Sequence, residues 1–275
     1  MQTARHVLLG CKLTHQPEKV IASLVSEFKG VGNYPQGLDP QFLRQCDVGQ
    51  ALMLAVMRHL SYRTPPDVQK RLIDGFEVAL DYFYGEWWKD RTDLAFDFGI
   101  MIDKTHPNRD LIWFKTFSAG LLLGLLTERW SDIARLCSWV EPDLKPEYMG
   151  GQIEDQLVYI YFSVAASLRT DPMPELAGLE AGIKKCRTKR SRLLFKAWEA
   201  ARAGDQSAFD KAFRESLEHF DSTYYTASTV VEWIAQHQSV VWLAAKRLGL
   251  KFPPLPERLA AMIITRESLG LSATE

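Results

Sequence analysis

The sequence predicts an all-α protein made of stacked antiparallel helix pairs, in an array that resembles tetratricopeptide repeats in geometry. Apolar side chains recur at helical spacing along most of the 275 residues, and clusters of Gly, Pro and Asp separate the periodic segments. The clearest apolar stripe is formed by Leu72, Phe76, Leu80, Phe83 and Trp87, which step by 4, 4, 3 and 4. These steps place all five side chains on one side of a helix, whereas a strand would send them to both faces.

Three helices are expected in the N-terminal part of the chain. The first spans Pro17 to Phe28 and ends before Gly30, and the second follows a Gly- and Pro-rich loop and spans about Gln41 to Leu60. The third helix begins after Pro65-Pro66 and carries the apolar stripe. The segment from Asp93 to Asp103 is also assigned to a helix, with a buried strand as the alternative.

The segment from Leu111 to Leu126 is apolar on all sides and is predicted to be the central core helix. It carries Lys115 and is shorter than the roughly 20 apolar residues that a membrane span requires. We therefore expect no membrane association. Two further helices are predicted over Trp130 to Val140 and over about Gln152 to Leu168.

The C-terminal part is predicted to begin with a helical hairpin. Leu193, Ala197 and Ala201 form the apolar stripe of the first arm, and the second arm contains four apolar residues between Phe209 and Phe220. Gly204 supplies a left-handed residue at the end of the first arm, and Asp205 can cap the second. The chain is expected to fold as a single domain over residues 1–275, with a subdivision into 1–170 and 171–275 as the alternative.

A last long helix is predicted over about Thr226 to Leu248. Lys246 and Arg247 lie in its final turn, and Gly249 and Leu250 fit a Schellman stop. After an extended Pro-rich segment, a final short helix is expected near Glu257 to Thr265.

The composition is that of an ordinary globular protein, with 47% hydrophobic residues, 33 Lys+Arg, 34 Asp+Glu and a formal net charge of -1. This balance argues against a protein that is held on nucleic acid by its overall charge. The four cysteines are scattered without CxxC spacing, so we expect reduced, mostly buried thiols. The apolar run near the N-terminus is too short for a secretory signal, and this favours a cytoplasmic protein.

Motifs that would indicate catalysis or cofactor binding are absent from the sequence. It contains no HExxH, no Gly-rich phosphate loop and no GxSxG elbow, and no Glu precedes a histidine by three positions. We therefore expect no enzymatic activity, no cofactor and no metal. The alternative is an enzyme whose site assembles only in the fold, for example from His106 with distant carboxylates such as Asp97 or Glu154.

Two clusters are candidates for binding a partner. Three aromatic residues, Tyr82, Tyr84 and Trp88, lie beside the apolar stripe and are of the types that anchor protein interfaces, although tight helix packing would explain them equally simply. The second cluster is a basic run without acidic residues, whose alternative is a solvated helix junction. It consists of Lys184, Lys185, Arg187, Lys189, Arg190 and Arg192.

The C-terminal third carries a pattern that resembles a known family. Its parts are Leu193 to Ala200 (LLFKAWEA), Gly204-Asp205, the arm from Phe209 to Phe220, and Ser239 to Leu250 (SVVWLAAKRLGL). Together they resemble the all-helical immunity-49 family of bacterial polymorphic-toxin immunity proteins, over roughly residues 181–250.

The resemblance implies a non-enzymatic cytoplasmic protein that protects its own cell by binding a cognate toxin. It implies no catalytic residue. The alternative non-enzymatic function is a helical-repeat scaffold or regulator that binds another protein or peptide. The sequence also leaves open that the chain forms a homodimer.

Overall fold

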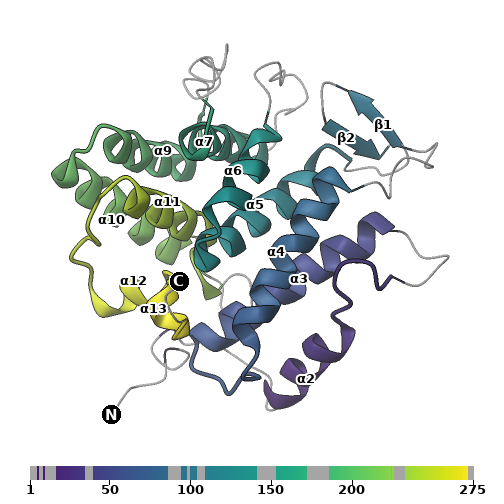
Figure 1. Cartoon of the computed structure of the whole chain (residues 1–275). Coiled ribbons are helices and arrows are strands. Elements are labelled where there is room, and N and C mark those ends of the chain that lie inside the picture. The colour runs from purple at the N-terminus through teal and green to yellow at the C-terminus, as the bar shows by residue number, and fades with distance from the viewer. Residues whose placement is uncertain are drawn as a thin grey trace.

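Helices follow one another along nearly the whole of the described chain, and the predicted all-α class is confirmed (Figure 1). This computed structural model describes residues 5, 9, 17–34, 40–85, 94–97, 100–103, 109–140, 153–171, 186–223, 225 and 233–271. The helices are α2 (Pro17–Glu27), α3 (Pro40–His59), α4 (Val68–Tyr84), α5 (Arg109–Thr127), α6 (Trp130–Ser138), α7 (Ile153–Leu168), α9 (Lys189–Arg202), α10 (Gln206–Thr223), α11 (Gln236–Arg247), α12 (Glu257–Ala261) and α13 (Arg266–Leu269).

The prediction of a helix between residues 93 and 103 is wrong. Strand β1 (Leu94–Asp97) pairs antiparallel with β2 (Ile100–Asp103), so that Leu94 lies opposite Asp103 and Asp97 opposite Ile100. Only two residues separate the strands in the sequence, and one of them is Gly99. A two-residue connection that contains Gly is typical of a β-hairpin, and apolar residues recur at every second position from Leu94 to Ile102, which is the period of a strand.

Helix α5 occupies the centre of the fold, as predicted for the apolar segment (Figure 1). It packs against α3, α4, α6, α7 and α11, and its side chains from Leu121 to Leu126 are buried. Nearly all buried apolar side chains of the described residues form one cluster that extends from Leu9 to Leu269. Among the described residues, no helix is long and apolar enough to cross a membrane.

Helices α3 and α4 approach each other closely at a glycine. A Cβ atom added to Gly75 on α4 would overlap the Cβ of Ala51 on α3. A Cβ atom added to Gly120 on α5 would lie 2.6 Å from the Cβ of Ala79 on α4. Real Cβ atoms do not come so close, so the α3–α4 pair depends on the missing side chain at position 75.

We expect Gly75→Ala to lower the free energy of unfolding by about 2 kcal/mol. Overpacking of a core costs about 1–3 kcal/mol, and the severe overlap places this site at the upper end. The higher helix propensity of Ala returns about 1 kcal/mol. Urea denaturation followed by far-ultraviolet circular dichroism would measure the change.

The double variant Ala51→Gly/Gly75→Ala is the matched control, because it moves one methyl group across the same contact. It should recover most of the lost stability and show a large coupling free energy in the double-mutant cycle. Additive losses would mean that the two positions do not meet.

The predicted hairpin of α9 and α10 is confirmed in its turn as well as in its arms. Gly204 has a φ of 69°, and the Schellman hydrogen bonds run from Asp205 N to Ala200 O (3.0 Å) and from Gly204 N to Ala201 O (3.1 Å). Asp205 Oδ1 accepts a hydrogen bond from Ala208 N at 2.9 Å, which caps α10.

The predicted last long helix is wrong at its start and correct at its end. Helix α11 begins at Gln236, and Ala235 N donates to Met262 O (2.8 Å) instead of to a carbonyl of a preceding helical turn. At the other end, Gly249 has a φ of 95° and Leu250 N donates to Ala245 O at 3.1 Å, which confirms the Schellman stop. Residues 226–232 lie outside the described part of the chain.

The predicted final helix is shorter than expected, because α12 ends at Ala261, and α13 is a further helix that the sequence analysis does not predict. Thr265 is extended and caps α13 through a reciprocal pair of bonds: Ser268 N donates to Thr265 Oγ1 (3.1 Å), and Thr265 N donates to Ser268 Oγ (3.0 Å). This capping box begins a new helix at the residue where the predicted helix ends.

Candidate functional site

The structure separates the three aromatic candidates. Tyr82 is fully buried, and its hydroxyl accepts a hydrogen bond from Gln41 Nε2 at 3.1 Å. The prediction that Tyr82 contacts a partner is therefore wrong, because its side of α4 faces α3. Tyr84 is exposed, although its hydroxyl donates to Arg135 O (2.6 Å) and the Arg135 guanidinium lies 4.9 Å from the ring centroid. Trp88 lies outside the described residues.

The described part of the basic run lies at the beginning of α9. Arg187, Lys189 and Arg192 are exposed and Arg190 is half-buried, whereas the predicted candidates Lys184 and Lys185 lie outside the described residues. Helix α9 packs against α7, α10 and α11, while α4, which carries Tyr84, packs against α3, α5 and α6. The aromatic and basic candidates thus belong to different helix neighbourhoods and do not form one site.

The side chains named for the enzyme alternative, those of His106, Asp97 and Glu154, lie outside the described part of the chain. Another histidine, His237, accepts or donates a hydrogen bond at 2.9 Å with the Tyr161 hydroxyl, and burial holds its pKa well below the ordinary value. No group of three or more His, Cys, Asp or Glu among the described residues is placed to hold a metal ion.

The described cysteines form no disulfide bond with one another and are mostly buried, as predicted. Cys137 and Cys186 are buried and Cys46 is partly exposed, while Cys11 lies outside the described residues. Burial raises the pKa of Cys137, so this thiol stays protonated at neutral pH.

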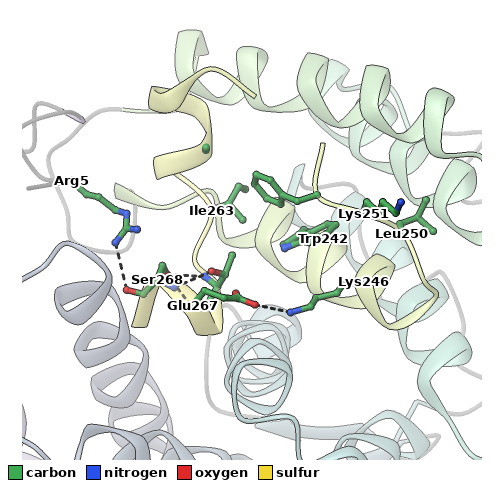
Figure 2. A pocket seen from close by; sticks show the side chains of 11 residues that line it. Arg5, Trp242, Lys246, Leu250, Lys251, Ile263, Glu267 and Ser268 are labelled. Atoms are coloured by element: carbon green, nitrogen blue, oxygen red, sulfur yellow. Dashed lines mark hydrogen bonds and ion pairs between the residues drawn. The ribbon is translucent and has the colours of Figure 1, made fainter. Parts of the chain in front are cut away.

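A cavity of about 570 Å³ lies at the C-terminal end of α11 (Figure 2). Its apolar wall is formed by Trp242, Leu250, Phe252 and Ile263, which come from α11, from the segment after it and from the connection between α12 and α13. Arg5, Lys246, Lys251 and Glu267 are the charged residues that line it. We refer to these residues, with Ala260, Thr265 and Ser268, as the α11 pocket.

The segment after α11 is held in place by side chains of α10. Gln206 bonds both backbone polar groups of Lys251, since its Nε2 donates to Lys251 O (3.0 Å) and its Oε1 accepts from Lys251 N (2.8 Å). Arg214 donates to the carbonyl oxygen of Pro254. These bonds, together with the restricted φ of the prolines at 253 and 254, give the wall a defined backbone.

The two aromatic residues of the pocket have different roles. Trp242 is only 5% exposed and packs beside Phe209, with ring centroids 6.4 Å apart. Phe252 is 39% exposed and meets Trp242 edge to face at 4.9 Å with an interplanar angle of 80°. Trp242 therefore anchors the wall to the core, and Phe252 presents an apolar surface to solvent.

The charged residues of the pocket are three cations and one carboxylate. Glu267 is paired with Lys246 at 2.8 Å, and the hydrogen bond from Lys246 lowers the pKa of Glu267 to about 2 (Figure 2). Arg5 donates to the backbone carbonyl oxygens of His59 (3.0 Å) and Ser268 (3.5 Å). Because these carbonyl groups carry no net charge, they do not neutralise the guanidinium. The pocket is consequently positive at neutral pH.

This pocket is not among the sites that the sequence predicts. The segment from Phe252 to Pro256 was interpreted only as an extended connection, and the signal that could have pointed further is an aromatic residue that follows Lys251 directly after the stop of a helix. The remaining residues lie far apart in the sequence, so no local pattern joins them.

Comparisons with protein-family models, with curated proteins and with solved structures found no match to this chain.

Proposed function

We propose that the protein is an immunity protein that neutralises a cognate bacterial toxin by binding it directly, without catalysis. The observation that carries the proposal is the surface at the end of α11. Leu248 and Phe252 are two of the large apolar side chains that the described surface exposes, and they lie beside Lys246, Arg247 and Lys251 in the sequence. Exposed apolar residues that are surrounded by polar side chains are typical of protein-binding surfaces.

The resemblance to the immunity-49 family supports the proposal at the same place. Its last part, Ser239 to Leu250, forms most of α11 and the Schellman stop after it. Val240, Val241 and Ala244 are buried in the core, so the helix is fixed and presents its C-terminal surface without further ordering. A preorganised surface loses little conformational entropy on binding, which favours a tight complex.

The toxin encoded next to this protein in its genome is the direct probe of the proposal. Co-expression of the full chain should restore growth of cells that produce this toxin, while a toxin from an unrelated locus should kill them equally with and without the chain. If the adjacent toxin kills the cells equally with and without the chain, the proposal is contradicted. If the chain in that case forms a complex with a different protein, the scaffold alternative is favoured.

A titration separates binding from the enzyme alternative. When purified chain is added to a fixed amount of toxin, the residual toxin activity should fall in proportion to the chain and vanish near a fixed molar ratio. An enzyme that modifies the toxin would remove its activity at far lower ratios, given time.

A further inference from the structure

We propose that the α11 pocket is the docking site for an acidic segment of the partner protein, which inserts one large apolar side chain and places carboxylates on the surrounding cations. This inference rests on the proposed function, because it names the part of the toxin that the pocket would bind. The geometry that points to it is an apolar wall of Trp242, Phe252 and Ile263 within reach of Arg5 and Lys251.

The size of the pocket suits an inserted side chain. Its volume of about 570 Å³ lies within the usual range of about 300–1,000 Å³ for ligand sites. Phe252, already in edge contact with Trp242, leaves 39% of its surface to be covered. An aromatic or branched aliphatic side chain would bury this surface, and such buried anchors supply most of the binding energy in protein interfaces.

The charges of the pocket select an acidic segment. The carboxylate of Glu267 is matched to Lys246, whereas the positive charge of Arg5 meets backbone carbonyls and Lys251 is exposed. A basic segment would face this excess of positive charge, while Asp or Glu beside the inserted side chain would compensate it. Charge complementarity of this kind accelerates association and excludes wrong partners.

The polar groups inside the pocket favour a protein segment over a small metabolite. Sites for small molecules fix their ligands with precisely placed polar groups in the interior. Here Ser268 Oγ bonds to His59 and Thr265, and Thr265 Oγ1 accepts from Ser268 N. The interior hydroxyls are thus bonded to His59 and to backbone groups of the capping box, and the charged groups available to a ligand are long side chains, as in the polar rim of a protein interface.

Selection of random peptides displayed on phage against the immobilised full chain tests the inference. The enriched peptides should combine Asp or Glu with Trp, Phe or Leu, and their synthetic versions should bind about tenfold more weakly to the Lys251→Glu and Phe252→Ala variants. Raising the salt concentration should weaken this binding as well. Lys19→Glu and Val31→Ala are the matched controls on exposed positions of α2 and the loop after it, and they should bind like the original chain.

Other outcomes of the selection would overturn the inference. These are the absence of enrichment, enrichment of neutral or basic peptides, and acidic peptides whose affinity does not change in Lys251→Glu. Thermal unfolding of each variant by circular dichroism identifies any loss that comes from misfolding.

Toxin neutralisation separates the docking site from the proposed function. If Lys251→Glu and Phe252→Ala abolish neutralisation while the control variants retain it, both proposals are supported. Full neutralisation by these two variants would keep the immunity function and overturn the docking site. If acidic peptides bind in a way that requires Lys251 but the original chain does not neutralise the toxin, the docking site is supported and the immunity function is contradicted.

Discussion

Trp198→Ala is expected to lower the free energy of unfolding by about 3–5 kcal/mol. Trp198 lies on α9, is fully buried, and donates a hydrogen bond from its indole nitrogen to Ser163 Oγ on α7 at 2.9 Å. Truncation leaves a large cavity between the two helices and removes the bond that fixes their relative position. Urea denaturation of the purified chain would give the loss as a lower midpoint with an unchanged slope.

Two variants divide this effect into packing and hydrogen bonding. Trp198→Phe keeps an aromatic ring in the core and removes the indole N–H, so its loss should be clearly smaller than that of Trp198→Ala. Ser163→Ala leaves the indole N–H without this acceptor, which should cost about 1–3 kcal/mol. A larger loss in Ser163→Ala than in Trp198→Ala would contradict the dominance of packing.

Trp130 provides a matched control for the truncation. It is only partly buried, and its ring is covered by the guanidinium of Arg247 at 4.5 Å from the centroid. Trp130→Ala therefore removes an indole without leaving a closed cavity. It should destabilise the chain much less than Trp198→Ala, and equal losses would mean that the environment of Trp198 is less tightly packed than the structure shows.

Local signals in the sequence were sufficient to predict most of the helices. Phe209 and Phe213, for example, are both buried, and the turn at Gly204 has the expected left-handed conformation. Capping and periodicity act over a few residues and are visible in any one segment. The same reasoning failed at β1 and β2, where the period of two and the short connection with Gly99 indicate a hairpin instead of the predicted helix.

Long-range arrangement could not be derived from spacing. Tyr82 and Tyr84 both lie next to the apolar stripe of α4, yet only the position of α3 decides that Tyr82 is buried. The α11 pocket shows the same limit, since Arg5 and Ser268 are 263 residues apart in the sequence. Neither residue type nor period indicates that they meet, because the contact is produced by the packing of several helices.

The second large effect is a loss of stability at mildly acidic pH that depends on His59. This histidine ends α3 and is fully buried between α3 and the C-terminal helices, with Nδ1 2.7 Å from Ser268 Oγ and Nε2 2.7 Å from Ala261 O. A carbonyl oxygen only accepts, so Nε2 carries the hydrogen and Nδ1 is unprotonated in the neutral ring.

Burial lowers the pKa of His59 to about 4 from an ordinary value of 6.5. The nearby charge of Arg5 acts in the same direction, and the hydrogen bond to Ala261 acts against it. Between these two pH values the unfolded chain binds a proton that the folded chain does not bind. Stability is therefore complete above pH 6.5 and is lost as the pH falls toward about 4, by about 3 kcal/mol from this group.

His59→Gln should flatten this part of the pH profile, because glutamine does not titrate. The variant will be less stable than the original chain at pH 7, since it loses a well-matched hydrogen-bonding ring, so the quantity to compare is the slope of the unfolding free energy between pH 7 and pH 4.5. His237, whose pKa is also depressed by burial, contributes a separate slope that should persist in the variant. An unchanged slope in His59→Gln would mean that His59 takes up its proton at the same pH in the folded and the unfolded chain, and the two hydrogen bonds that hold α12 and α13 against α3 would then have to be reassigned.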